Sequence, residues 1–233
     1  MKLALLSDIH GNQYALSKVI NEIKMKNIET LIVAGDTVGY YYGIKDVLNL
    51  LSNFKVYFTK GNHEVMLEQL RINPIIELEL TNKYGSSLRL ALNSLSETEI
   101  DQLLNLEHPK SITVENLNIL ISHGSPWDIN QYLYPDSDKS IWDNFLRYKE
   151  NIFIVGHTHY QHTEKIGSKI IINPGSVGQN RLKVGLADWA VFDTESLSVT
   201  HYSTPYSVEK LIDECINIDP GNTLLTKQLG YRN

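Results

Sequence analysis

The sequence predicts an α/β fold in which two β-sheets pack against each other and helices cover their outer faces, an αββα sandwich. Two observations favour this fold. Short apolar runs alternate with segments of helical periodicity over the first 60 residues, which is typical of a parallel sheet with right-handed crossovers. A second series of short apolar runs begins after residue 107, and a helical stretch separates the two series.

The first 60 residues predict three strands joined by two helices. Residues 3–6 form the first apolar run, which ends at the polar pair Ser7-Asp8. The helix that follows has Leu16, Val19 and Ile23 on one face, and Asn12 is its candidate cap. The remaining elements expected here are a strand at 31–34, a helix at 44–51 and a strand at 55–59.

Residues 64–107 have apolar spacings that predict helices, and we expect this stretch to be a helical insertion within a single domain spanning 1–233. Ser96 and Glu99 have the spacing of a capping box, so one helix is expected to begin there. A last helix is expected from 207 to about 216. The strands expected in between are 112–115, 117–122, 152–155, 161–166, 169–173, 187–193 and 198–202.

The composition is that of an ordinary globular chain of 233 residues, with 42% apolar and 21% charged residues. A single cysteine, Cys215, excludes an internal disulfide and a cysteine-based zinc site. The net charge of −6 disfavours long nucleic acids as partners but leaves room for a small phosphorylated substrate. The apolar runs are too short for a signal peptide or a membrane span, so we expect a cytoplasmic protein without a membrane partner.

Five polar motifs follow expected strands, where ligands bind in open α/β sheets. They are Asp8-Ile9-His10-Gly11-Asn12, Gly35-Asp36, Gly61-Asn62-His63-Glu64, His123-Gly124 and Gly156-His157-Thr158-His159. Residues two apart in an extended chain project to the same side, so Asp8 should meet His10, and His157 should meet His159. Carboxylate, imidazole and amide donors without thiolate suit manganese, iron, zinc, cobalt or nickel. Seven such donors fit two ions that share one carboxylate.

With these motifs in this order, the chain resembles the calcineurin-like metallophosphoesterase superfamily, and most of all its small bacterial and archaeal phosphodiesterase branch. The resemblance extends from Asp8 to about Asp193. It is strongest in Ser7-Asp8-Ile9-His10-Gly11-Asn12, His123-Gly124-Ser125-Pro126 and Asn173-Pro174-Gly175-Ser176-Val177-Gly178. It implies a phosphoric ester hydrolase with two divalent transition-metal ions, among which manganese is favoured.

The resemblance also implies a role for each motif residue. Seven residues would hold the ions. The first ion would be bound by Asp8, His10, Asp36 and His159. The second would be bound by Asn62, His123 and His157 together with Asp36, which would bridge the two ions. His63 would protonate the leaving-group oxygen or stabilise its charge. A metal-bridging hydroxide would then attack the phosphorus of a small phosphodiester.

Three positions depart from the family pattern. Gly39 stands where many relatives have the last aspartate of Gly-Asp-x-x-Asp, so any contribution of that aspartate is missing. No arginine stands beside the second or third motif, which disfavours a protein phosphatase because lysine does not reproduce an arginine's bidentate phosphate clamp. Asn180 replaces the proline of the branch's Gly-Gln-Pro-Arg, and Arg181 beside it is a candidate substrate clamp.

Several residues allow two interpretations. Asn12 is either a helix cap or a substrate contact, and Glu64 is expected to be a helix-start charge rather than a base. The run 40–42 of three tyrosines, with Tyr40 as the candidate contact, either packs within its loop or offers a stacking surface to a nucleobase or aryl group. The same two interpretations apply to Trp127, Tyr132 and Tyr134.

Alternative functions also fit the sequence. A phosphomonoesterase or a dinucleoside-polyphosphate hydrolase would use the same motifs, because loops and the helical insertion would set specificity. A remote alternative is a metal-poor interaction scaffold, as in the retromer subunit that resembles this fold. The sequence is compatible with a homo-oligomer.

Overall fold

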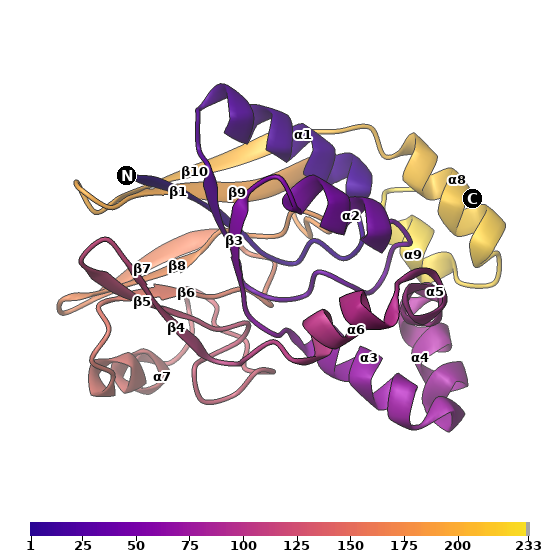
Figure 1. Cartoon of the computed structure of the whole chain (residues 1–233), viewed down its shortest axis with the longest axis horizontal. Helices are drawn as coiled ribbons and strands as arrows, with labels where there is room; N and C mark the ends of the chain where they lie inside the picture. Colours follow the sequence, from indigo (N-terminus) through magenta and orange to yellow (C-terminus); the bar gives the residue numbers. More distant parts are fainter. Residues whose placement is uncertain (232–233) are drawn as a thin grey trace.

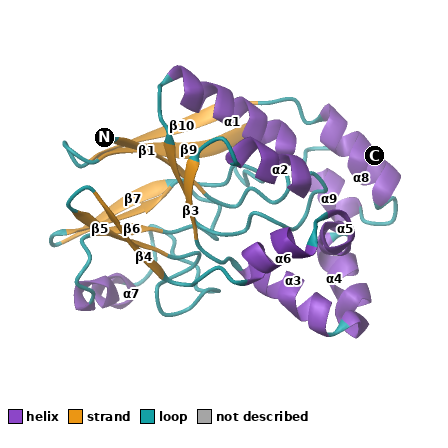
Figure 2. Ribbon diagram, in the orientation of Figure 1, coloured by secondary structure: helices purple, strands orange, loops and turns teal. Residues whose placement is uncertain are grey.

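Two mixed five-stranded sheets lie face to face in the computed structural model, which describes residues 1–231 (Figures 1 and 2). The first sheet has the order β10-β9-β1-β2-β3 and the second the order β4-β5-β6-β8-β7. This arrangement confirms the predicted α/β sandwich. The strands of the first sheet are β1 (Lys2–Leu6), β2 (Thr30–Val33), β3 (Lys55–Phe58), β9 (Leu186–Asp193) and β10 (Ser198–Pro205). Those of the second are β4 (Lys110–Val114), β5 (Leu117–Ile121), β6 (Ile152–Ile154), β7 (His162–Ile166) and β8 (Lys169–Asn173).

Each sheet contains three parallel strands, β1, β2 and β3 in one and β5, β6 and β8 in the other. The strands β9, β10, β4 and β7 are antiparallel to their neighbours. Because parallel strands end on the same side of a sheet, each sheet presents a row of carboxyl ends at one edge. The polar motifs follow these ends.

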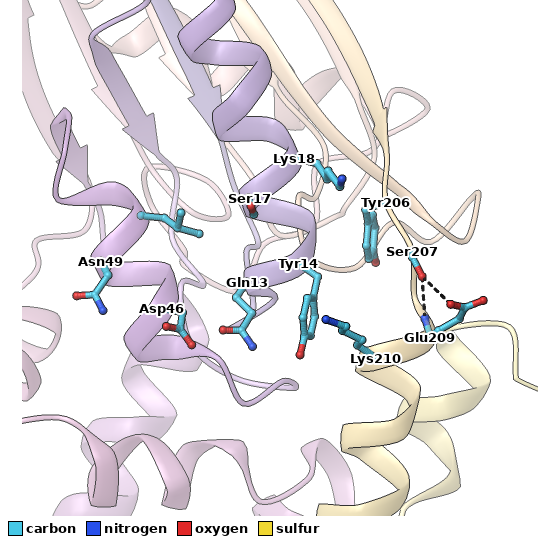
Figure 3. Close-up of a pocket in the computed structure, with 11 residues that line it drawn as sticks. Gln13, Tyr14, Ser17, Lys18, Asp46, Asn49, Tyr206, Ser207, Glu209 and Lys210 are labelled. Atoms are coloured by element: carbon cyan, nitrogen blue, oxygen red, sulfur yellow. Dashed lines mark hydrogen bonds between the residues drawn. The ribbon is translucent and has the colours of Figure 1, made fainter.

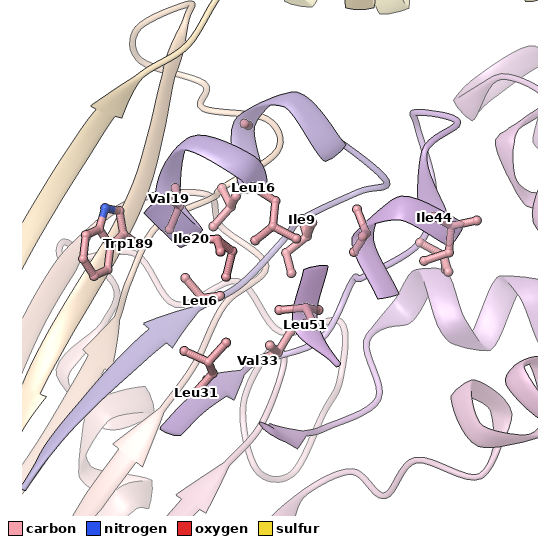
Figure 4. Close-up of a cluster of buried hydrophobic side chains, with 14 of the residues drawn as sticks. Leu6, Ile9, Leu16, Val19, Ile20, Leu31, Val33, Ile44, Leu51 and Trp189 are labelled. Carbon is pink, nitrogen blue, oxygen red and sulfur yellow. The ribbon is translucent and has the colours of Figure 1, made fainter. Parts of the chain in front are cut away.

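The core has layers because neighbouring side chains of a strand point to opposite faces. Leu3 and Leu5 of β1 face the second sheet and pack in the same cluster as Ile119 and Ile154. Leu6, on the other face, packs against α1 (Gln13–Met25), in the cluster shown in Figure 4. Continuous apolar runs thus become strands that are buried on both faces.

Four α-helices and a 3₁₀ turn lie between β3 and β4. They are α3 (Asn62–Ile72), the turn η1 (Pro74–Ile76), α4 (Glu77–Tyr84), α5 (Ser87–Ser94) and α6 (Glu97–Leu104). The expected capping box is present, since Glu99 Oε2 accepts from Ser96 N at 2.7 Å and Ser96 Oγ from Glu99 N at 3.3 Å. The remaining predicted helices are α2 (Ile44–Leu51) and α8 (Glu209–Ile218).

Three short helical segments were not predicted: α7 (Lys139–Asp143), the 3₁₀ turn η2 (Asn144–Arg147) and α9 (Thr223–Gln228). Trp142 and Phe145 of α7 and η2 cover the outer face of the second sheet, where they pack with Phe153. Leu225 of α9 packs against α8. Among residues 1–231, no helix is long and apolar enough to cross a bilayer.

Candidate metal centre

The polar motifs form turns with unusual backbone geometry. Asp8, His10, Asp36, His157 and His159 all have positive φ, between 51° and 67°. Residues other than glycine rarely adopt this left-handed conformation, and it is strained unless the surrounding structure imposes it. The prediction that each Asp-x-His or His-x-His pair converges from an extended chain is therefore wrong in its geometry. Asp8 and His10 still meet, whereas His157 and His159 belong to different groups of ligand atoms.

The turns are tied to one another by backbone hydrogen bonds. Asp8 N donates to Gly35 O at 3.1 Å, and His10 N donates to Asp36 O at 2.9 Å. The backbone of Gly156 lies so close to Asp8 that a Cβ there would come within 2.9 Å of Asp8 Oδ2. The same carboxylate oxygen accepts from His157 N at 3.0 Å. The Gly156-His157 motif of the second sheet is thus held against the Asp8 motif of the first sheet.

A first group of ligand atoms consists of Asp8, His10 and His159, all buried. Asp8 Oδ1 lies 3.2 Å from His159 Nε2 and 3.8 Å from His10 Nε2. The two Nε2 atoms lie 3.2 Å apart. These are three of the four residues expected to hold the first ion.

A second group consists of Asp36, His123 and His157. His123 Nε2 lies 3.2 Å from Asp36 Oδ2, 3.1 Å from His157 Nδ1 and 2.8 Å from Asn62 Oδ1. Asp36 Oδ2 also lies 3.8 Å from His10 Nε2, so this carboxylate stands between the two groups. All seven residues expected as ligands therefore meet at one place.

The donor set fits metal ions because its carboxylates, and its imidazoles in their neutral form, turn acceptor atoms inward. The Nδ1 atoms of His10, His123 and His159 face the backbone carbonyls of Val38, Ala34 and Gln179. A carbonyl only accepts, so each Nδ1 carries a proton, and each ring in its neutral form turns the Nε2 lone pair inward. In that form, the Nε2 lone pairs of His10 and His159 face each other, with the two nitrogens 3.2 Å apart. Asp8 Oδ1 beside them has no hydrogen-bond partner. A cation would satisfy all three atoms.

The pKa values reflect the same concentration of charge. Burial raises the pKa of Asp8, but His159 and His123 outweigh it and hold the pKa below its usual value. Burial would lower the pKa of His123, yet Asp36 and Asp8 raise it to about 10. Burial lowers the pKa of His157 to about 4, with His123 contributing. Without metal, a proton on His123 offsets part of the carboxylate charge.

His63 lies beside the two groups and forms a third group of possible ligand atoms with His10 and Asp36, its Nε2 4.0 Å from Asp36 Oδ2. Its ring packs against Tyr40 and against Tyr84, a residue of α4 that the sequence did not single out. Its Nδ1 is buried without a partner and faces Gly39, whose φ is +93°. Because position 39 is a glycine and not the aspartate of many relatives, it has no side chain that could pair with His63 Nδ1.

Glu64 has a larger role than the expected helix-start charge. Its fully buried carboxylate accepts from four backbone N–H groups, those of Gly61, Asp36, Thr37 and Val38, at 2.7–3.2 Å. Burial and the charge of Asp36 raise the pKa of Glu64 to about 7. This side chain joins the turn after β2 to the start of α3 and so positions Asp36 relative to Asn62. The Gly-x-x-Glu spacing at a helix start was the only sequence signal for it.

The side chains proposed as substrate contacts differ in their exposure to solvent. Asn12 is fully buried and caps α1, with Oδ1 accepting from Ala15 N at 3.0 Å and Nδ2 donating to Gly178 O at 2.8 Å. The capping interpretation is therefore confirmed. Tyr40 packs edge-on against His10, and Arg181 is exposed. Tyr41 is buried against α8, so it offers no stacking surface.

A separate cavity of about 700 Å³ lies between α1, α2 and the start of α8 (Figure 3). Polar side chains such as Gln13, Tyr14 and Lys210 line it. None of the seven expected ligands and neither His63 nor Arg181 belongs to its lining. The metal centre and this cavity are thus distinct places on the molecule.

Buried aspartate, histidine and asparagine side chains that converge at the strand ends of a two-sheet sandwich define a metal-dependent hydrolytic enzyme. Residues 1–197 match the family model of the calcineurin-like phosphoesterase superfamily domain. The chain belongs to this superfamily and is a phosphoesterase that depends on divalent metal.

Individual proteins are similar to most of the chain. The uncharacterized protein MJ0912 of Methanocaldococcus jannaschii is 29% identical over 234 residues, which cover 92% of this chain and 91% of that protein. Phosphodiesterase MJ0936 of the same organism is 25% identical, over 75% of this chain and 83% of its own length. The crystal structure of the hypothetical protein PH1004 from Pyrococcus horikoshii shares the fold, with a TM-score of 0.84 at 22% identity over 98% of this chain and 97% of that one.

Proposed function

We propose that the protein hydrolyses phosphodiester bonds of small molecules with two divalent transition-metal ions held by the seven converging residues. The observation that carries the proposal is the pair of acceptor groups that meet at Asp36. Asp8, His10 and His159 would hold one ion, and Asn62, His123 and His157 the other, with Asp36 shared. Bound there, such ions would act as Lewis acids and bring the pKa of a water toward ~7.

The chain's own residues would prepare the site for an anionic substrate. Two divalent ions carry more positive charge than Asp8 and Asp36 remove, so the centre is cationic although the protein is acidic overall. His63, whose Nε2 faces the site at 4.0 Å from Asp36 Oδ2, would give a proton to the departing oxygen or stabilise its charge. Tyr40 and Tyr84 would keep its ring in place.

A singly charged diester suits the residues around the centre better than a dianionic monoester. Lys60, directly before the third motif, is paired with Glu68 at 2.9 Å. No arginine adjoins the second or third motif, and Arg181 is exposed. Within residues 1–231, the second and third motifs therefore contribute no arginine that could clamp a second phosphate charge.

The test is hydrolysis of bis-p-nitrophenyl phosphate and p-nitrophenyl phosphate by manganese-loaded protein, with metal content measured in parallel. We expect two ions per chain and faster cleavage of the diester. Cleavage of the monoester alone would indicate a phosphomonoesterase, and preference for a dinucleoside polyphosphate would indicate that class of hydrolase. Absence of bound metal and of hydrolysis would favour a scaffold. Manganese as the native metal, a cytoplasmic location and a homo-oligomer stay predictions.

A further inference from the structure

A row of tyrosine rings begins at His157 and extends away from the centre. Tyr132 stacks on the His157 imidazole, with centroids 4.1 Å apart and an angle of 29° between the planes. The Tyr134 ring is parallel to that of Tyr132 at 5.8 Å and 1°. Tyr160, the residue after His159, meets Tyr134 edge-on at 6.5 Å. We call Tyr132, Tyr134 and Tyr160 the tyrosine row.

The tyrosine row is open to solvent. Tyr132, Tyr134 and Tyr160 are 43%, 36% and 37% exposed, whereas Leu133 between the first two is fully buried. Leu133 packs with Trp142 and Phe145 under the second sheet. Because Leu133 is anchored inward, the tyrosines on either side of it are turned outward.

The loop that carries Tyr132 and Tyr134 is held in shape by hydrogen bonds of its own. Ser125 N donates to Asp128 O at 2.9 Å, and Asn130 N donates to Asp128 Oδ1 at 2.8 Å. Tyr134 N donates to Ser137 Oγ at 3.0 Å. The rings are thus positioned in advance, which reduces the entropy lost when a ligand stacks on them.

Positive charge lies near the same part of the site. Lys83, at the end of α4, is exposed and holds its Nζ 5.0 Å from the centroid of the Tyr84 ring. The Tyr84 ring in turn packs against that of His63, at the edge of the metal centre.

We propose that the tyrosine row binds the nucleobase of a nucleotide phosphodiester while its phosphate occupies the metal centre. This inference rests on the proposed diesterase function and names its substrate class. Nucleotides are phosphoric esters that carry a planar aromatic ring, and base–aromatic stacking contributes about 1–3 kcal/mol per base with little dependence on the base. Since Tyr132 contacts His157 directly, a base on the row stays next to the reacting phosphate.

Two esters with the same leaving group test this proposal: thymidine 5′-(p-nitrophenyl phosphate) and methyl p-nitrophenyl phosphate. We expect kcat/KM of the manganese-loaded protein to be about 10-fold or more higher for the thymidine ester. The double variant Tyr132→Leu/Tyr134→Leu should lose this preference, measured as the ratio of the two kcat/KM values, because the methyl ester has no base to stack. Trp127→Leu is the matched control, because this residue of the same loop is 39% exposed but packs against Phe145 and Tyr148.

A preference that persists in the double variant, or an equal loss on both esters, would overturn the inference. Calorimetric titration with thymidine 5′-monophosphate and with inorganic phosphate separates it from the proposed function. Suppose that the protein cleaves neither ester but binds the nucleotide about 10-fold more tightly than phosphate, and that the double variant binds both equally. The diesterase proposal would then fail, whereas the tyrosine row would be supported as a base-binding surface. Equal affinity for nucleotide and phosphate would refute the row as a base-binding surface.

Discussion

Asp36 lies between the two acceptor groups, since its Oδ2 faces His123 at 3.2 Å and His10 at 3.8 Å while its Oδ1 accepts from His63 N. Removing this carboxylate should therefore disturb both metal positions at once. We expect Asp36→Ala to lose both ions and essentially all activity, measured as metal per chain and as diester hydrolysis. Asp46→Ala, at an exposed position of α2, is the control. Unchanged metal content in Asp36→Ala would contradict the assignment of Asp36 as the shared ligand.

His63 is close to both groups but belongs to neither of the two expected ligand sets. We expect His63→Ala to retain the ions and to lower turnover by ~10²-fold, as for loss of a general acid. The loss should be smallest for good leaving groups, because they need no proton. Rates for esters of p-nitrophenol and of phenol measure this difference. Equal losses on both would show that His63 is not the acid.

The protonation of His123 makes metal binding depend on pH. Its pKa of about 10 in the metal-free protein exceeds the usual 6.5, because Asp36 and Asp8 outweigh the effect of burial. The proton thus stabilises the metal-free fold fully below pH 6.5, and this stabilisation is lost as the pH rises through 10.

Metal must displace this proton, since a ligand histidine is neutral. We expect binding at pH 7.5 to release about one proton per chain and the apparent affinity to increase with pH. Titration calorimetry with manganese in buffers of different ionisation enthalpy measures the release. A binding enthalpy independent of the buffer would contradict protonation of His123.

Which residues meet at the centre was predictable, because every motif follows an apolar run and strands of one sheet end together. The backbone conformation of Asp8, His10 and the other ligands was not, since left-handed turns at aspartate and histidine depend on contacts between the two sheets. Tyr84 was missed for the same reason. Only the packing of α4 brings it onto His63.

At the scale of elements, the start of α3 is fixed to the turn after β2 by the Glu64 carboxylate. A glutamine would present an amide N–H₂ to N–H donors where the carboxylate now accepts, and Asp36 would no longer be held in place. Outer-sphere substitutions of this kind cost about 10–100-fold in metal affinity or activity, and we expect Glu64→Gln to fall in that range.

Glu68→Gln is the matched control, because Glu68 lies one turn further along α3, is 41% exposed and pairs with Lys60 rather than with the turn after β2. Manganese affinity and kcat/KM of both variants measure the effect. If the two variants behave alike, the four backbone bonds of Glu64 do not position the ligand.

The strands were predictable to within a few residues because they are buried apolar runs, whereas the short helices were not. A five-residue segment such as α7 is too short to show helical periodicity, and its formation depends on Trp142 and Phe145 covering the second sheet. The formation of α9 likewise depends on its packing against α8. Leu225 and Leu229 are buried, but their spacing in so short a segment gave no signal.

At the scale of the whole molecule, the C-terminal helices extend the fold beyond residue 197, where the family match ends. The helices α8 and α9 form a small core with Tyr41, which belongs to the loop after the second motif. Gln228, the last residue of α9, bonds to Gln179, whose carbonyl accepts from His159 Nδ1 at 2.6 Å. The helices α8 and α9, which lie next to each other in Figure 1, thus support the loops that carry Tyr41 and Gln179.

Two neighbouring leucines of α9 test this support. Leu225 is 1% exposed and packs with Leu211 and Tyr41, while Leu224 is 54% exposed. We expect Leu225→Ala to lower the free energy of unfolding by about 2–5 kcal/mol, because it leaves a cavity that the surrounding side chains only partly fill. Leu224→Ala should change it by no more than about 0.5 kcal/mol. Urea unfolding of both metal-free variants gives the two values, and equal effects would mean that α9 does not pack on this core in solution.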